Sequence, residues 1–332
     1  MDANYTEVKN KGKTFRVPHA DVEGRDVVVT GKWLRVAAVN DEIWLEGEPV
    51  DDPETFIRKL RESPLKADVF TFMQKLPSTA PRYGYHYEWD NVAAIAVTTY
   101  KEWEAGLSQD TRRNVRRGPK KGVVARVAEF DDELVRGIIG IHDEAPMRQG
   151  LPFAHYGKGF DTVKADYGTF PEQSEFLGAY LGDELIGVIK LVHMGNAAGI
   201  MQIVTKTLHY DKRPTNLLIA KAVEVCAEKK IPYLTYCKYV YGNKTDNTLT
   251  EFKRRNGFVK VDLPRYYVPL TLRGKVAMKL RLHRGALGIL PLGAITLLLG
   301  LRSRYNRLRH RLSGRDPEPP GCMKDDGSFD TK

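Results

Sequence analysis

Two short basic segments hold residue types that bind phosphate and carboxylate groups. In the first, residues 112–121, six of ten positions are arginine or lysine, Arg112 and Arg116 among them. The second, residues 212–216, lies at a predicted strand-to-helix turn. Free N–H groups at a helix N-terminus bind anions, and adjacent cations strengthen that binding. We therefore expect a phosphorylated ligand to bind the second segment through Lys212, Arg213, Thr215 and Asn216.

The charge distribution argues against a protein that coats nucleic acid. The chain has 52 Lys and Arg against 42 Asp and Glu, a net charge of +10. Twelve basic residues and no acidic residue lie between Asp262 and Asp316. Without these twelve, 40 basic residues face 42 acidic ones, so the body is near neutral. Because sequence-independent affinity grows with the number of phosphates neutralised, we expect no duplex DNA partner.

The composition is that of a globular protein with reduced thiols. The chain has 332 residues, 42% apolar and 28% charged, a length that suggests two domains or half-domains. Cys226, Cys237 and Cys322 show neither disulfide nor metal-ligand spacing, so we expect no metal site. The first residues lack a basic segment followed by an apolar core, which argues against a secretory signal. We expect the body to lie in the cytoplasm.

The C-terminal part has the composition of an element that binds a membrane surface. Residues 285–301 carry no charge, but Pro291 and four glycines interrupt a stretch barely long enough to span a bilayer. The chain after them has the pattern of a basic amphipathic helix, with apolar positions Leu301, Tyr305, Leu308 and Leu312. We expect residues 273–315 to lie in the anionic inner leaflet, as a peripheral or monotopic element. A helical hairpin packed on the body is the alternative, and residues 316–332 are expected to be disordered.

Turn signals and apolar runs predict a mixed α/β fold. Residues 1–25 are expected to be a flexible N-terminus. Strands are predicted at 27–29, 33–39, 43–45, 69–73, 92–97, 123–127, 175–181, 185–192, 200–204, 233–236 and 258–261. Helices are predicted at 52–63, 100–107, 108–117, 131–144, 215–229 and 248–255. Hairpins interrupted by helices indicate an α/β or α+β mixed sheet rather than a bundle.

Three segments together resemble the FemAB-like branch of the GNAT acyltransferase fold. Residues 107–123 are similar to the basic helix and Gly-Val strand start that open the transferase domain of that family. Residues 210–218 match its strand-to-helix turn, and residues 251–258 contain its Phe-Lys element followed by Gly-Phe. A weaker match covers residues 142–152. The resemblance implies two tandem GNAT-like halves, a degenerate one at 26–105 and the transferase domain at 106–272, before the membrane-associated helical segment at 273–315.

The resemblance also implies roles for single residues. The lysine of the Phe-Lys element lies in the acyl-transfer channel of FemAB-like transferases, so Lys253 is expected to stabilise an oxyanion or an acidic substrate. Amide formation needs a base, for which Glu144 and His142 are candidates, and Tyr236 is a candidate proton donor to the leaving group. Substrate contacts are expected from Arg148, Gln149, Lys238, Arg112 and Arg116. The alternatives are a solvated helix face for Lys253, a packed aromatic for Tyr236 and a surface or capping group for Glu144.

These expectations describe an acyl- or aminoacyltransferase. It would pass a group from acyl-CoA or aminoacyl-tRNA, as co-substrate rather than bound cofactor, to an amine or hydroxyl of a cell-envelope glycan, peptidoglycan or lipid-linked precursor. Residues 212–216 lack the Gly-rich loop of acetyl-CoA-binding GNAT enzymes, and Pro214 removes one N–H donor, so the donor stays open. The basic run at 112–121 favours tRNA. The rival is a non-catalytic membrane-surface adaptor that keeps the fold.

Overall fold

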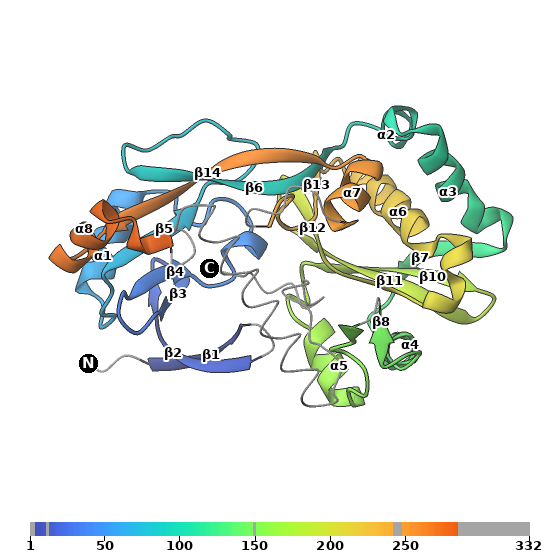
Figure 1. Cartoon of the computed structure of the whole chain (residues 1–332), viewed down its shortest axis with the longest axis horizontal. Coiled ribbons are helices and arrows are strands. Elements are labelled where there is room, and N and C mark those ends of the chain that lie inside the picture. The colour runs from blue at the N-terminus through green and yellow to red at the C-terminus, as the bar shows by residue number, and fades with distance from the viewer. Residues whose placement is uncertain (1–3, 11–12, 149–150, 242–247, 285–332) are drawn as a thin grey trace, which may run out of the picture.

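One mixed sheet of 12 strands runs through the chain (Figure 1). The structure is a computed structural model, and it describes residues 4–10, 13–148, 151–241 and 248–284. The strand order is β1-β2-β3-β4-β5-β14-β6-β13-β12-β11-β10-β7. The expected α/β mixed sheet is confirmed.

The first half of the sheet consists of antiparallel strands followed by one parallel strand. The antiparallel strands are β1 (Asn4–Asn10), β2 (Lys13–Val22), β3 (Arg25–Thr30) and β4 (Val36–Val39). After the 3-10 helix η1 (Glu42–Trp44), helix α1 (Pro53–Glu62) crosses over to β5 (Val69–Met73), which pairs parallel with β4. Asp52 caps α1 as its sequence predicts, because its carboxylate accepts from the N–H groups of Glu54 and Thr55.

The second half repeats this arrangement. Its antiparallel strands are β7 (Val123–Ala128), β10 (Ser174–Leu181), β11 (Glu184–His193) and β12 (Ala197–Thr205). After the 3-10 helix η2 (Thr207–Lys212), helix α6 (Pro214–Glu228) crosses over to β13 (Tyr233–Thr235), which pairs parallel with β12. Both halves therefore have an antiparallel sheet, a crossover helix and a parallel strand in the same order, which bears out the two tandem GNAT-like halves.

Two long strands join the halves, because each strand follows one half in the sequence and pairs with a strand of the other half. β6 (His86–Ala96) follows the first half but pairs with β13, and β14 (Val259–Pro269) follows the second half but pairs with β5. The two strands also pair with each other along nine residue positions. Residues 259–269 therefore complete the first half of the sheet, although the sequence analysis assigned them to the transferase domain.

Helices cover both faces of the second half of the sheet. α6 packs on one face and α4 (Asp132–His142) with α5 (Phe160–Tyr167) on the other (Figure 1). α2 (Tyr100–Gly106), α3 (Gln109–Lys120) and α7 (Thr248–Arg255) lie on the α6 side. The remaining elements are the short strands β8 (Met147–Arg148) and β9 (Leu151–Pro152), helix α8 (Leu272–Lys279) and the 3-10 helix η3 (Leu282–Arg284).

Three local expectations differ from the structure. Residues 4–10 and 13–22, expected in a flexible N-terminus, form the edge hairpin β1-β2, in which Val17 and Val22 are buried. Residues 43–45, expected as a strand, lie in η1 and the residue after it, because Asp41 turns the chain with a φ of 50°. α3 runs to Lys120, three residues beyond its predicted end, with Pro119 in its last turn.

The expected membrane segment lies mostly outside the described residues. α8 and η3 belong to its first part, and residues 285–315 and the tail at 316–332 are not described. In the part of the chain that the structure describes, no helix is long and apolar enough to cross a bilayer.

Candidate functional site

Helix α3 places the basic run beside the start of α6. The side chain of Ser108 caps the helix at its N-terminus, as expected, by accepting from the N–H of Thr111. Val115 is buried, and Gly118 lets the helix approach α6 closely, since a Cβ there would lie 2.9 Å from Leu217 Cδ2 and 3.3 Å from the Lys212 carbonyl oxygen. One side of α3 therefore packs, and the arginines and lysines remain on the other.

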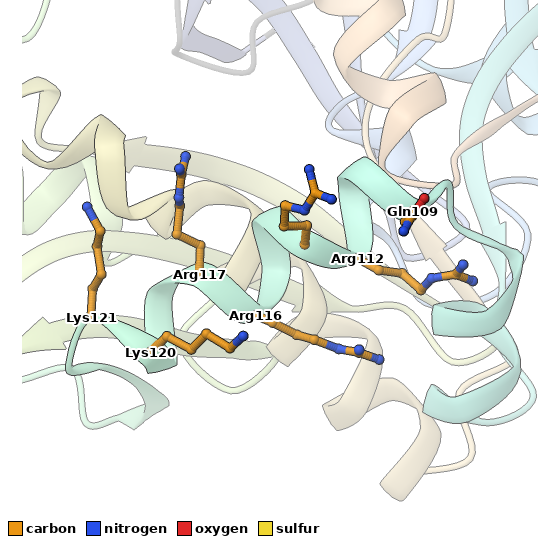
Figure 2. Close-up of a pocket in the computed structure, with 7 residues that line it drawn as sticks. Gln109, Arg112, Arg116, Arg117, Lys120 and Lys121 are labelled. Carbon is orange, nitrogen blue, oxygen red and sulfur yellow. The ribbon is translucent and has the colours of Figure 1, made fainter.

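The exposed side of α3 forms an open basic groove. Its lining consists of Gln109, Arg112, Arg113, Arg116, Arg117, Lys120 and Lys121, around a volume of about 560 Å³ (Figure 2). Arg112 donates to the Ala105 carbonyl at 3.0 Å, and Arg116 pairs with Glu104 at 3.1 Å. Both expected substrate-binding arginines are thus oriented by α2, and six cations line one groove.

The predicted donor segment starts α6 next to this groove. Arg213 has a left-handed φ of 57° and precedes Pro214 at the first helical position, and no side chain caps the helix. Thr215 Oγ1 lies 3.2 Å from Thr205 Oγ1 at the end of β12. Lys212 contacts the Asp211 carboxylate at 3.3 Å, which compensates part of its charge. N–H groups at such a helix start suit an anion, and donor binding here stays a prediction.

β12 and β13 diverge close to this helix start. The two strands pair only between residues 197–199 and 233–235, whereas β12 continues to Thr205. After β13 the chain turns at Cys237, which has a left-handed φ of 47°. Asn91 of β6 holds the following segment, because its side chain donates to the Val240 carbonyl at 3.2 Å and accepts from the Val240 N–H at 2.8 Å. Residues 236–241 therefore form a fixed wall beside the divergence.

Lys253 lies buried against this wall. Its Nζ donates to the Lys238 carbonyl at 2.6 Å and lies 4.5 Å from the centre of the Tyr236 ring and 5.1 Å from that of Tyr241. The side chain is fully buried, and among the described residues no carboxylate forms an ion pair with it. Burial lowers the pKa of Lys253 to about 8, which the neighbouring Cys237 thiol only partly offsets. The alternative of a solvated helix face is therefore wrong for Lys253.

A chain of charges connects this wall to the first half of the sheet. Lys238 Nζ lies 3.0 Å from Asp90 Oδ1, Arg265 Nε lies 3.1 Å from Asp90 Oδ2, and Arg265 Nη2 lies 2.6 Å from Glu42 Oε1. Burial raises the pKa of the Asp90 carboxyl, but Arg265 and Lys238 outweigh that effect and leave it below its usual value. Lys238, expected to bind substrate, is thus partly neutralised by Asp90.

A pair of asparagines couples α6 to α7. The Asn216 side chain donates to Asn256 Oδ1 at 2.8 Å, and the Asn256 amide donates in turn to the Phe252 carbonyl, also at 2.8 Å. Asn256 follows the last residue of α7, one turn after Lys253. Two side-chain hydrogen bonds therefore join the predicted donor segment to the C-terminal end of α7, the helix that carries the predicted catalytic lysine.

Glu144 and Arg148 contact the segment that leads from β12 to α6. Glu144 accepts from the N–H and hydroxyl of Thr207 and from the N–H of Leu208, all within 2.7 Å, and these bonds with Arg148 hold its pKa below the usual value despite burial. Arg148 donates to the Thr205 carbonyl at 3.0 Å. Such a carboxylate is a weak base, and both side chains instead fix the segment leading to α6.

His142, the other candidate base, lies in the protein core. His142 is buried, and burial together with the charge of His155 lowers its pKa to about 3. A neutral imidazole enclosed between α4 and α5 is typical of a core residue. Gln149 lies outside the described residues.

Sequence reasoning missed five residues of this region: Asp90, Asn91, Tyr241, Asn256 and Arg265. Asp90 and Asn91 lie inside a strand, and Arg265 lies 175 positions further along the chain, so only the pairing of β6 with β14 brings them together. Asn256 directly follows the helix predicted at 248–255, and no pattern in the sequence gives it a further role. The adjacent polar residues Asp90 and Asn91, directly before the apolar run at 92–97, were the one local signal available.

Solved structures of other proteins resemble the structure of this chain. FemX superposes with a TM-score of 0.54 at 9% identity, covering 84% of this chain and 90% of FemX. L-PGS from Bacillus licheniformis gives a TM-score of 0.49 at 12% identity, covering 80% and 87%. A tandem GNAT protein from the clavulanic acid biosynthesis pathway gives 0.41 at 11%, covering 79% and 81%. No family model and no curated protein matches the sequence. At 9% identity, the likeness to FemX shows a shared fold, in agreement with the fold that the resemblance in the sequence predicts.

Proposed function

We propose that this chain is an acyl- or aminoacyltransferase whose reaction takes place where β12 and β13 diverge. The observation that carries the proposal is the desolvated ammonium of Lys253 beside that divergence, coupled through Asn256 and Asn216 to the uncapped start of α6. A buried lysine without a carboxylate partner costs stability, and such costs concentrate at functional sites. The FemX-like fold supports the reaction class.

In the proposed reaction, Lys253 and Tyr236 have separate roles. An acceptor amine attacks the donor carbonyl, the carbonyl oxygen becomes an oxyanion, and the thiol or ribose oxygen of the donor leaves with a proton while the amine loses one. Lys253 stabilises the oxyanion, which replaces the Lys238 carbonyl as its hydrogen-bond acceptor. Tyr236, whose ring packs over the ammonium, is the proposed proton donor to the leaving group. Glu144 is not the base in this scheme, because its two carboxylate oxygens already accept hydrogen bonds from Thr207 and Leu208.

The pH dependence of the reaction follows from the pKa of Lys253, about 8. Because the oxyanion is stabilised by the protonated form, we expect kcat to fall as the pH rises through about 8. In Lys253→Arg the guanidinium stays charged, so that variant should be slower but should lack this alkaline decline. Transfer rates measured between pH 6 and 10 test this; a wild-type rate that increases through pH 8 would assign Lys253 the role of a base instead.

The groove on α3 supports an aminoacyl-tRNA as donor over acyl-CoA. Its six cations offer many contacts to a nucleic-acid backbone, whereas the turn before α6 has a proline where a phosphate-binding loop needs N–H groups. We expect charge reversal of Arg113 and Arg117 to weaken tRNA binding at least about 10-fold at low salt. The slope of log affinity against log salt should decrease by about one per lost phosphate contact.

A charge-matched control is available on α1. Lys59→Glu with Arg61→Glu alters the net charge equally but lies on the first half of the molecule. Fluorescence anisotropy with labelled tRNA, beside calorimetric titration with CoA, separates the donors. Equal weakening by both double variants, or binding of CoA in place of tRNA, would contradict the RNA donor.

We further propose that the acceptor is a lipid-linked or glycan precursor at an anionic membrane surface. Helix α8 supports this, because Leu272, Val276 and Leu280 form a stripe that is 79%, 56% and 57% exposed. The exposed Trp33 lies beside the stripe, since Arg273 donates to its carbonyl at 3.3 Å. Lys275, Lys279 and Arg281 add positive charge. An exposed apolar stripe among cations fits anionic lipid.

Vesicle binding by the full chain tests the membrane proposal. We expect Leu272→Ser with Val276→Ser to weaken binding to phosphatidylglycerol vesicles about 100-fold or more, since each buried apolar side chain contributes roughly 1.5–3 kcal/mol and about 1.4 kcal/mol is a factor of ten. Phosphatidylcholine vesicles should bind weakly in every case. The control is Val124→Ser with Val127→Ser, two exposed residues on the edge strand β7. Equal binding by both double variants would exclude α8 as the membrane contact.

A non-catalytic adaptor on the same fold is the second candidate, favoured by the complete burial of Lys253. A panel of acyl-CoA and aminoacyl-tRNA donors with amine acceptors separates the two candidates. Transfer that depends on Lys253 supports the enzyme. Vesicle binding with no transfer from any donor, and no loss of function in Lys253 variants, supports the adaptor.

A further inference from the structure

Two histidines and a glutamate converge away from the proposed reaction site. His86 and Glu88 lie on the same face of β6, because residues two apart in a strand share a face. His283 comes from η3, almost 200 positions along the chain. His283 Nε2 lies 2.7 Å and His86 Nε2 3.7 Å from Glu88 Oε1, and one ligand atom from each residue lies within 4.8 Å of the others.

The distances between these atoms match a shared metal ion. Tetrahedral zinc holds nitrogen and oxygen ligands at about 2.0–2.2 Å, so neighbouring ligand atoms are roughly 3.3 Å apart. The two measured separations, 2.7 and 3.7 Å, lie on either side of that value. The two imidazole rings also meet edge to face, at 85° with their centres 5.8 Å apart. Two imidazoles and one carboxylate form the ligand set of an open zinc site, with water in the fourth position.

Hydrogen bonding alone accounts for only part of the cluster. An ion pair between Glu88 and His283 explains the short contact, but 3.7 Å is too long for a hydrogen bond from His86. The His283 side chain is 2% exposed, and its Nδ1 is buried with no hydrogen-bond partner among the described residues. The His86 side chain is 54% exposed, so an ion has a path from solvent. One ion bound to all three residues explains both the long and the short contact.

One neighbouring cation must move for the ion to bind. Arg284 Nε lies 2.7 Å from Glu88 Oε1, on the same oxygen as His283. Its side chain is 36% exposed, so the guanidinium turns to solvent without being buried unpaired. Among the described residues, Tyr267 also packs on His283, with ring centres 4.9 Å apart, and holds the imidazole from the β14 side. The ring is thus oriented before the metal arrives, as in other metal sites.

We propose that His86, Glu88 and His283 bind a zinc ion or a similar divalent transition metal, with water as the fourth ligand. The ion joins η3 to the central strand β6. It thereby fixes the chain just before residue 285, where the uncharged stretch of the C-terminal part begins. This site is independent of the proposed transferase reaction, so the failure of either proposal leaves the other intact.

Metal binding by the full chain is the test. After treatment with a chelator and dialysis, calorimetric titration with Zn²⁺ should show one ion per chain with micromolar or tighter affinity. Co²⁺ in place of Zn²⁺ should give visible absorption bands of a low-coordinate site. His86→Ala is the decisive variant, because His86 is more than half exposed and the Glu88–His283 ion pair remains. We expect it to weaken Zn²⁺ binding at least about 10-fold, and Glu88→Gln and His283→Asn at least as much.

His193→Ala is the matched control. His193 also contacts a glutamate, with Nε2 2.8 Å from Glu175 Oε2, but Lys229 occupies the same oxygen at 2.9 Å and no third metal ligand is present among the described residues. Zn²⁺ should raise the melting temperature of wild type and of this control, but not of His86→Ala. Absence of binding by wild type, or equal affinity in wild type and His86→Ala, would overturn the site.

Discussion

Lys253→Met should lower kcat about 10²- to 10³-fold while leaving the fold intact. The loss is that expected when one preorganised donor to an oxyanion is removed. Methionine matches the length of the lysine stem and fills the space against the Tyr236 and Tyr241 rings. Transfer kinetics with the donor identified from the panel give kcat, and a melting curve gives stability.

The stability readout separates a functional lysine from a structural one. Lys253 is fully buried without a carboxylate partner among the described residues, so methionine removes a desolvation cost. The melting temperature of Lys253→Met should therefore be equal to or above that of wild type. Arg254→Met is the control, because its guanidinium is exposed and pairs with Glu251 at 2.8 Å. A less stable Lys253→Met with unchanged kcat would show that Lys253 only supports the wall.

Arg265→Met should destabilise the protein by about 3–5 kcal/mol. The guanidinium lies between the carboxylates of Glu42 and Asp90, which are both buried, and removing one partner of a buried ion pair leaves uncompensated charge. The pKa of Arg265 is raised by these two carboxylates, although burial opposes the shift. Urea unfolding followed by circular dichroism measures the change, with the midpoint expected to fall at constant slope.

Arg255→Met is the matched control for this measurement. Arg255 also pairs with a carboxylate, at 2.6 Å from Glu251, but its side chain is 66% exposed. Exposed pairs contribute about 0–1 kcal/mol, so this variant should unfold almost as wild type does. If Arg265→Met also cost less than about 1 kcal/mol, the charge chain would not hold the two halves together.

Helices and caps with local signals could be predicted from the sequence alone. Asp52 and Ser108 cap their helices as predicted, because a capping side chain binds N–H groups two or three residues away. The Phe-Lys element correctly placed Lys253 on a short helix, and the basic run at 112–121 correctly marked an exposed helix face. Fold class followed from the same local patterns, since hairpins and crossover helices are recognised within about 30 residues.

The contacts between these elements could be known only from the tertiary structure. β6 pairs with β14 and β13 across more than 130 positions, and no local pattern encodes which distant strand supplies the partner. That pairing brings Arg265 to Asp90. Burial against residues 236–241, not helix periodicity, gives Lys253 its low pKa. Glu144 looked like a base because a carboxylate near a cleft can be one, but its reactivity depends on hydrogen bonds to Thr207 and Leu208 that form only when the chain folds.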